Sequence, residues 1–411
     1  MSQWDTIIVG AGIVGLAVAY ELMARRPEDR LLVVDREVSV AAHQTGHNSG
    51  VIHSGLYYRP QSLKARLTRL GRALLVNFLD QEHLAYKISG KLVVARRVEE
   101  LYALEQLFQN GVANRVPQIA LWPGDRLREI EPSVLGIRAI YSPTTGVVDY
   151  SAVARRMAER LQKAGHCLCL GHGVRHVVVD AGLVRMRLDN GEELSAPHAI
   201  VAAGIGTDRL ARQARLALNA RMIPFRGDYL VVAENRRDLV RSMIYPVPNP
   251  RLPFLGVHFT RRLDGALWIG PNAVLAASRT IYRRIALSRH DLWDTISFPG
   301  FWRMARQQWR AGLDEWMRDH CKRLYLSQVR EYVPELAPMD VHWGPMGIRA
   351  QLVDASGTLV DDFRLATLGP VMFVLNAPSP AATSAFAIAR YLVESCAPNF
   401  GWKLSRPLLT P

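Results

Sequence analysis

The distribution of hydrophobic residues predicts a chain in which buried strands alternate with amphipathic helices. The β-branched and apolar run Thr6–Val9 predicts a first buried strand, and Leu31–Val34 predicts a second. The apolar residues between them continue to Met23 and predict a helix, which Pro27 ends. Further helices are expected where apolar residues recur at helical spacing, in segments 62–82, 98–110, 150–164, 278–330 and 385–395.

Shorter apolar runs predict more strands, and two of them lie far along the chain from the first. Strands are expected at 86–95, 166–170, 174–180, 183–188 and 196–204, within 223–270, and at 371–375. Asp189-Asn190-Gly191 is a typical hairpin turn. Segment 111–145 has no clear period and contains several prolines, so we expect an irregular excursion there. The apolar strands that end near Gly204 and at 375 are expected to rejoin the first sheet.

A glycine motif, Gly10-Ala11-Gly12-Ile13-Val14-Gly15, lies between the first strand and its helix. Gly10 permits a tight turn, Gly12 lets the backbone approach a pyrophosphate, and Gly15 lets the helix pack closely on the sheet. The helix N-terminus then directs its free N–H groups at the phosphates. Asp35, ~20 residues further on, ends the second strand where a ribose is expected. The sequence therefore predicts a bound dinucleotide, with contacts from Gly10, Gly12, Ile13, Val14, Gly15, Asp35 and Arg36.

The segment 43–58 is a long polar loop, because its apolar residues follow neither the strand nor the helix period. Long loops without regular structure are usually functional, so we expect this one to fold along the cofactor. Its expected cofactor contacts are Thr45, Gly46, Asn48, Ser49 and Gly50. Three histidines lie in the loop, but without a neighbouring carboxylate cluster their spacing does not predict a metal site.

Composition narrows the functional classes without choosing among them. A hydrophobic content of 49% with 21% charged residues in 411 residues is typical of a globular protein with one or two domains. The net charge of +14 favours anionic partners, which include small acids, membrane surfaces and nucleic acids. The four cysteines show no C-x-x-C spacing, which indicates free thiols and a cytoplasmic protein. The first strand begins too early for a signal peptide, and no apolar run reaches the ~20 residues of a membrane span.

The repeated return of the chain to one sheet favours a flavin over a nicotinamide cofactor. A simple NAD dehydrogenase keeps its nucleotide domain contiguous, whereas here three separated segments are expected to build it. The helix that follows Thr383 can direct a positive dipole end at the flavin, where negative charge develops on reduction. We therefore expect FAD. Its further contacts are predicted at Val174, Ala203, Gly204, Pro378, Ser379, Ala381, Ala382 and Thr383.

The expected fold is α/β, with a Rossmann-type FAD-binding domain assembled from three chain segments and a mixed-sheet α+β substrate domain. Segments 1–85, 146–220 and 345–396 are assigned to the first domain. Segments 86–145 and 221–344 are assigned to the second. Residues 397–411 form a tail without periodicity.

Several segments resemble the L-2-hydroxyglutarate dehydrogenase/oxidase family, within the D-amino-acid-oxidase-like flavoprotein superfamily, which the whole chain resembles. They are segments 43–55, 60–65, 224–227, 254–258, 270–273 and 376–384. The resemblance implies oxidation of L-2-hydroxyglutarate to 2-oxoglutarate, with FAD as the first electron acceptor. Asp35 departs from the glutamate that is more frequent in such flavoproteins. Covalent-flavin relatives use a cysteine near the C-terminal flavin loop, and 376–384 contains none, so noncovalent FAD is expected.

Oxidation of a 2-hydroxy acid transfers a hydride from Cα to flavin N5 and requires a base for the hydroxyl proton. Histidine fits this task, and His53 is the first candidate, followed by His258. Arg226 and Arg349 are the candidates for binding the two substrate carboxylates, and Tyr57 is a further predicted substrate contact. The alternative for each histidine is a hydrogen bond to the backbone. The alternative for each arginine is a buried structural ion pair.

Two other functions remain open from the sequence. An amine oxidase of the same fold would share the FAD and the carboxylate-binding arginine, and the long histidine-containing loop argues against it. A flavin-dependent RNA-modifying protein is suggested only by the net charge and by the Arg/Trp-rich segment 278–330. We favour a small dicarboxylate substrate and no nucleic acid. The electron acceptor is expected to be oxygen or a membrane quinone.

Trp302, Trp309 and Trp316 lie seven residues apart and form one stripe on the expected helix. A tryptophan stripe bordered by arginines suits peripheral contact with the cytoplasmic face of an inner membrane. The alternative is a helix whose tryptophans pack into the substrate domain. The cations beside the stripe are Arg303, Arg306, Arg310, Arg318, Lys322 and Arg323.

Overall fold

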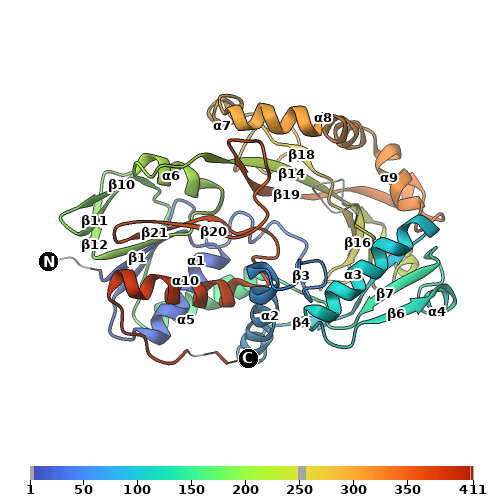
Figure 1. Ribbon diagram of the computed structural model, residues 1–411, viewed down its shortest axis with the longest axis horizontal. Coiled ribbons are helices and arrows are strands. Elements are labelled where there is room, and N and C mark those ends of the chain that lie inside the picture. The colour runs from blue at the N-terminus through green and yellow to red at the C-terminus, as the bar shows by residue number, and fades with distance from the viewer. Residues whose placement is uncertain (1–3, 249–255, 408, 411) are drawn as a thin grey trace.

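The computed structural model describes residues 4–248, 256–407 and 409–410, and these form two large sheets, one of six strands and one of nine (Figure 1). The six-stranded sheet has the order β20-β21-β13-β1-β2-β9. Its strands are β1 (Thr6–Val9), β2 (Leu31–Asp35), β9 (Cys167–Leu170), β13 (His198–Val201), β20 (Arg364–Leu368) and β21 (Val371–Asn376). Parallel pairing joins all of them except β20, which is antiparallel to β21. The expected return of the chain to one sheet from three separated segments is confirmed.

Alternate residues of this sheet enter two different cores, as expected for strands that are buried on both faces. Ile8 and Val33 pack with four helices, whereas Ile7 and Val34 pack toward a small three-stranded sheet. The helices are α1 (Ile13–Arg25), α2 (Leu63–Gln81), α5 (Tyr150–Lys163) and α10 (Ala385–Phe400). The small sheet contains β10 (Val174–Asp180), β11 (Leu183–Leu188) and β12 (Glu193–Ala196).

The nine-stranded sheet forms the other half of the molecule. Its order is β18-β14-β17-β16-β15-β5-β7-β6, with β19 paired to β14. On one face Leu104 and Leu107 of α3 (Leu101–Ala113) pack against β5, and on the other Leu326 and Val329 of α9 (Lys322–Arg330) join a second core. Its strands are β5 (Lys91–Ala95), β6 (Ala120–Pro123), β7 (Arg138–Ser142), β14 (Ala220–Val232), β15 (Met243–Pro246), β16 (His258–Arg261), β17 (Leu267–Gly270), β18 (Val274–Leu275) and β19 (Val341–Asp354).

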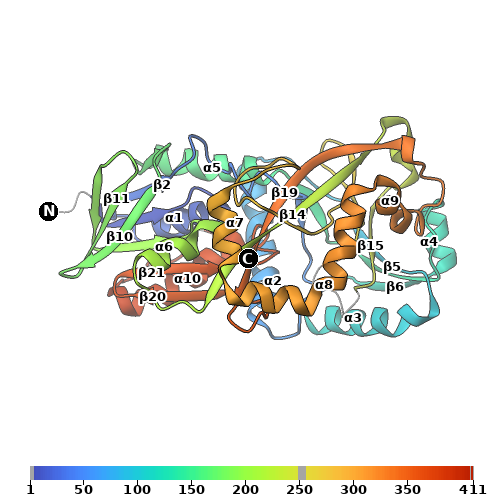
Figure 2. The same ribbon diagram turned by 90° about the horizontal axis from the view of Figure 1, so that it is seen from above.

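A long antiparallel ribbon of β14 and β19 connects the two halves, and Figure 2 shows the two strands side by side between them. At one end Ala220 and Leu352 lie in the core beneath the six-stranded sheet. At the other end Leu230 and Val341 lie in the core of the nine-stranded sheet. The ribbon therefore fixes the position of one half relative to the other.

The remaining described elements are short or lie at the surface. A third small sheet contains β3 (Val51–Ile52), β4 (Tyr86–Ile88) and β8 (Gly146–Val148). The other helices are α4 (Gly124–Ile130), α6 (Thr207–Gln213), α7 (Arg289–Ile296) and α8 (Pro299–His320), with 3-10 turns at Val98–Glu100, Gly204–Gly206, Glu234–Leu239 and Pro338–Asp340. No helix among the described residues is long and apolar enough to cross a membrane.

Three expectations from the sequence, and one of the alternatives, require correction. Segment 111–145 is not irregular, because it contains β6, α4 and β7, and its strands are stabilised by long-range pairing that begins at β5. The strand predicted at 86–95 is divided at Gly90, whose φ of +73° breaks the extended backbone. Helix α10 continues past residue 397, and the tail packs back through buried Trp402 and Leu409. The tryptophans of α8 do not pack inward, since Trp302, Trp309 and Trp316 are 58%, 58% and 55% exposed.

Candidate active site

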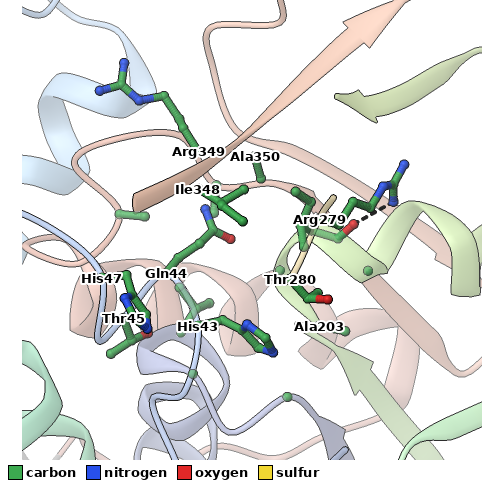
Figure 3. A pocket seen from close by; sticks show the side chains of 18 of the residues that line it. His43, Gln44, Thr45, His47, Ala203, Arg279, Thr280, Ile348, Arg349 and Ala350 are labelled. Atoms are coloured by element: carbon green, nitrogen blue, oxygen red, sulfur yellow. Dashed lines mark hydrogen bonds between the residues drawn. The ribbon is translucent and has the colours of Figure 1, made fainter. Parts of the chain in front are cut away.

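A cavity of about 740 Å³ follows the carboxyl ends of the parallel strands, where α/β folds usually bind ligands. It extends from Asp35 and Arg36 past the N-terminus of α1 to the loop before α10. Figure 3 shows Thr45 and Gln44 of the polar loop, Ala203 after β13 and Arg349 of β19 around part of this space.

The glycine motif has the geometry that the sequence predicted. Gly10 has a φ of +116°, and a Cβ atom there would lie 2.4 Å from the carbonyl oxygen of Ala202. A Cβ on Gly15 would lie 1.9 Å from the carbonyl oxygen of Gly10, so the third glycine serves helix packing. Gly12 caps α1 and meets only Thr45 Oγ1 within 4 Å, and the first turn contains no acidic residue. This end of α1 is therefore suited to bind an anion.

Asp35 is fixed at the end of β2 by two backbone groups. Its Oδ2 accepts a hydrogen bond from Ala11 N at 2.6 Å, and its Oδ1 accepts one from Glu37 N at 2.9 Å. The carboxylate therefore joins the glycine turn to the following loop while it lines the cavity. His43 of the polar loop is directed back to this region, with Nε2 2.7 Å from Glu37 Oε1.

The polar loop is held against α1 by its own small side chains. Ile13 N donates to Thr45 Oγ1 at 2.9 Å, and Asn48 Nδ2 donates to Thr45 O at 2.6 Å. Gly46 and Gly50 were expected to contact the cofactor, but neither lines the cavity. Both permit close backbone contacts instead, because a Cβ on Gly46 would lie 2.6 Å from Ala41 O and one on Gly50 would lie 2.7 Å from Val148 O.

All predicted cofactor contacts except Gly15, Gly46 and Gly50 line this cavity, although they come from distant parts of the chain. They are Gly10, Gly12, Ile13, Val14, Asp35, Arg36, Thr45, Asn48, Ser49, Val174, Ala203, Gly204, Pro378, Ser379, Ala381, Ala382 and Thr383. An elongated space with a ribose-binding acid near one end, a helix N-terminus beside it and a second helix start at the other fits FAD. Sequence reasoning missed Gln44 and Thr280, which also line it. Gln44 lies inside the family-like loop and could have been included on that ground.

A second cavity of about 1020 Å³ opens beside the far end of the first. The two share His53, Tyr229, Pro271, Arg349 and Ser379, among others. The second cavity alone is lined by Tyr57, Tyr58, Arg59, Lys64, Tyr245, His258 and Asp361. It therefore brings together both candidate bases, one candidate arginine and the predicted contact Tyr57.

His53 and His258 are neutral at pH 7 because burial disfavours their charged forms. Burial, with the charge of Lys91 as a smaller cause, lowers the pKa of His53 to about 3. Burial also lowers the pKa of His258 to about 4. His258 Nδ1 lies 2.9 Å from the carbonyl oxygen of Gly256 and donates to it, which leaves Nε2 as an acceptor. The backbone N–H of His53 donates to Thr383 Oγ1 at 3.2 Å, so the loop before α10 holds this histidine in place.

Lys91 is an additional cation near this site that sequence reasoning did not select. Its side chain is 1% exposed, and its Nζ lies 4.3 Å from the ring centre of Tyr57 and 4.8 Å from that of Tyr245. The Tyr245 ring in turn stacks on His258, with ring centres 4.0 Å apart. Within the described part of the chain, no carboxylate pairs with this ammonium group, and burial lowers its pKa to about 7. Nothing in the local sequence around Gly90 indicated this placement.

The two candidate arginines lie on neighbouring strands but have different surroundings. In the ribbon Phe225 is opposite Arg349 and Arg226 is opposite Ile348, so the two arginine side chains lie on opposite faces. Arg226 forms ion pairs with Asp319 and, at 3.1 Å, with Asp228. For Arg226, the structure therefore agrees with the alternative given from the sequence, a buried structural ion pair. Arg349 lines both cavities, and its side chain extends from β19 in Figure 3.

The histidines of the polar loop do not converge on one point. His47 stacks on Tyr282 with ring centres 3.8 Å apart, and His43 binds Glu37, whereas His53 faces the second cavity. No group of three side chains suited to hold a metal ion occurs among the residues that the structure describes. All four cysteines are free thiols.

Comparison with known families and proteins matches residues 5–395 to the family described as FAD dependent oxidoreductase. The mitochondrial L-2-hydroxyglutarate dehydrogenase of Homo sapiens is 39% identical over 415 residues, which cover 97% of this chain and 90% of the relative. The L-2-hydroxyglutarate dehydrogenase of Indibacter alkaliphilus is 39% identical over 405 residues, which cover 98% and 100%. The chain belongs to the L-2-hydroxyglutarate dehydrogenase family.

Solved structures show the same fold at lower identity. L-alpha-glycerophosphate oxidase from Mycoplasma pneumoniae, with FAD bound, has a TM-score of 0.78 at 23% identity and covers 99% of this chain, with 97% of that chain covered. Glycine oxidase from Geobacillus kaustophilus has a TM-score of 0.72 at 16% identity, with 100% and 97% covered. Membership of a family of FAD-dependent oxidoreductases makes FAD the cofactor of this L-2-hydroxyglutarate dehydrogenase family member.

The glycine motif provides a test of the cofactor site. Gly10→Ala would place a methyl group 2.4 Å from a backbone oxygen at a φ of +116°, so we expect most of the bound FAD to be lost. Gly312→Ala on α8 is the control, because a Cβ there meets nothing within 4 Å. The measurement is flavin absorbance per mole of purified protein. A Gly10→Ala protein with the flavin content of the wild type would contradict this assignment.

Proposed function

We propose that this chain oxidises L-2-hydroxyglutarate to 2-oxoglutarate with noncovalent FAD as the first electron acceptor. The observation that carries the proposal is the junction of the two cavities. There, the first cavity, which is suited to FAD, opens into the second cavity, called the chamber below. Two neutral histidines and Arg349 line this chamber. The relatives that are named for this activity match nearly the whole chain.

Bound FAD supplies the acceptor for the hydride that leaves Cα of the substrate. His53 accepts the hydroxyl proton, because its lowered pKa keeps the imidazole neutral before reaction. Its link to Thr383 supports this assignment, since the same residue lines the cofactor cavity. His258 is the second candidate, with Nε2 available as an acceptor.

Arg349 binds the carboxylate next to the reacting carbon. A guanidinium group offers two parallel donors to a carboxylate and so fixes the orientation of Cα as well as the charge. Tyr57 forms part of the chamber wall, above Lys91. Arg226 does not bind the substrate, because two aspartates already pair with its guanidinium group.

The direct test is anaerobic bleaching of the flavin by a panel of 2-hydroxy acids and amino acids. We expect L-2-hydroxyglutarate to bleach the flavin and the D-enantiomer to leave it oxidised. Reduction by glycine or sarcosine, without reduction by 2-hydroxy acids, would instead identify an amine oxidase of the same fold. Equal reduction by L-lactate would show that the second carboxylate is not recognised.

The low pKa of His53 predicts how the reductive rate depends on pH. A base must be neutral to accept a proton, so the rate should not fall as the pH decreases through 6.5, the ordinary histidine value. Lys91 carries its charge at acidic pH, because its own pKa is about 7. Lys91→Met should therefore raise the pKa of His53 and move the acid limb to higher pH. Stopped-flow reduction with jumps from neutral pH down to about pH 3 measures this, with exposed Lys87→Met as the control. A wild-type limb at about 6.5, or no shift in Lys91→Met, would refute the role of His53.

We also propose that α8 contacts an anionic membrane surface, where a quinone could receive electrons. The three tryptophans of its stripe are exposed, as is Trp293 of α7 at 68%. Figure 1 shows α7 and α8 together at one edge of the molecule. Tryptophan is favoured at the headgroup level, and arginine is attracted by anionic lipid. Arginines that remain exposed beside the stripe are Arg303, Arg306, Arg310 and Arg323. A surface with this many cations favours anionic lipid over a second copy of the same face.

Sedimentation with liposomes tests this contact. We expect the protein to sediment with vesicles of phosphatidylglycerol and phosphatidylcholine at low salt, and to be released by high salt because exposed charges are screened. Trp309→Ser should weaken the binding several-fold, whereas Tyr102→Ser, which removes an exposed aromatic side chain from α3, should not. Absence of binding at low salt, or equal loss in both variants, would contradict the proposal.

A further inference from the structure

The proposed substrate has two carboxylates, but Arg349 accounts for only one of them. Arg226, the other candidate from the sequence, is held by Asp228 and Asp319 on the opposite face of the ribbon. The described cations that line the second cavity are Arg349, Lys64 and Arg59. The candidates for the cation that binds the distal carboxylate are therefore Lys64 and Arg59.

We propose that Lys64 binds the distal carboxylate of the substrate and so gives the site its preference for a dicarboxylate. This inference rests on the proposed function. Lys64 lies in the first turn of α2, whose N-cap Ser62 also lines the cavity. Its side chain is only 12% exposed, and it lines the same cavity as the proposed base His53. The N-terminus of a 19-residue helix adds positive potential at the same place.

A carboxylate already occupies the position that this proposal gives to the substrate. Lys64 Nζ donates to Asp361 Oδ1 at 2.8 Å and to the carbonyl oxygen of Asp361 at 3.2 Å. The Asp361 side chain is 90% exposed, on the loop between β19 and β20, so water can replace its bond to the ammonium at little cost. An incoming carboxylate can therefore displace Asp361 and take over Lys64.

The ion pairs of Arg226 are buried, unlike the pair of Lys64 with Asp361, and a substrate carboxylate cannot easily replace their aspartates. The Arg226 and Asp319 side chains are 13% and 2% exposed, and Asn272 Nδ2 also donates to Asp319 at 2.9 Å. Separation of that pair would leave a buried charge without a partner, which is strongly unfavourable. A substrate can thus compete for Lys64 but not for Arg226.

The two other nearby cations fit the distal carboxylate less well. Arg59 is exposed to solvent, where a single ion pair contributes little to affinity. Lys91 is not among the residues that line either cavity, and the ring of Tyr57 lies 4.3 Å from its ammonium group. Tyr58 supports Lys64 from the side, with its ring centre 5.3 Å from Nζ.

The test compares L-2-hydroxyglutarate with L-2-hydroxyvalerate, which has the same carbon chain but a methyl group in place of the distal carboxylate. Lys64→Met should lower the ratio of kcat/KM for these two substrates at least about tenfold, because a charge-assisted bond is lost only with the first. Lys64→Arg should restore most of the ratio. Arg59→Met, the matched control from the same cavity, should leave it unchanged.

Asp361→Asn removes the competing carboxylate and should tighten binding of the unreactive dicarboxylate glutarate about twofold.

Glutarate binding, followed by perturbation of the flavin spectrum, provides a readout that does not depend on turnover. An unchanged substrate ratio in Lys64→Met, an equal loss in Arg59→Met, or weaker glutarate binding in Asp361→Asn would overturn the proposal. If Lys64→Met does not fold, Lys64→Arg and Asp361→Asn still decide. Failure of the wild type to oxidise L-2-hydroxyglutarate would refute the proposed function. If the wild type is active but Lys64→Met does not change the kcat/KM ratio, only the role of Lys64 is refuted.

Discussion

The pairing of β14 with β19 is the constraint on which the site depends. The ribbon begins in the core under the six-stranded sheet and ends in the core of the nine-stranded sheet, so its middle passes the junction of the two cavities. Arg349 and Arg226 both lie in that middle part. Because side chains alternate along a strand, the register places the two arginines on opposite faces of the ribbon, and of the two cavities Arg349 lines both whereas Arg226 lines only the first.

The cost of burying charge explains why the cations of this interior have different roles. A buried guanidinium needs a carboxylate partner, and Arg226 has two from the protein itself. Among the described residues, Lys91 lies over two aromatic rings and has no carboxylate partner, and burial lowers its pKa to about 7. Lys64 is paired with an exposed aspartate that a ligand can displace. These differences separate cations that stabilise the fold from cations that are suited to bind an acidic substrate.

The parts of the structure that depend on neighbouring residues could be predicted from the sequence, and those that depend on distant pairing could not. The glycine motif, the position of Asp35 at the end of the second strand and the helix predicted at 62–82 are local features, and the structure confirms them. The strands of segment 111–145 become stable only beside β5, which no local pattern reveals. Likewise, nothing near Arg226 indicates that Asp319, 93 residues away, is its partner. The burial of Lys91 between two tyrosines depends on the same kind of long-range packing.

The claim that one arginine binds substrate and the other stabilises the fold is tested most directly by the dissociation constant of glutarate. It should be measured by flavin difference spectra in Arg349→Met and in Arg226→Met. Our account predicts that Arg349→Met weakens glutarate binding at least about tenfold, because a charge-assisted contact to a carboxylate is lost. In Arg226→Met, the folded fraction should bind glutarate with nearly the wild-type constant. Weaker binding in Arg226→Met together with wild-type binding in Arg349→Met would contradict the account.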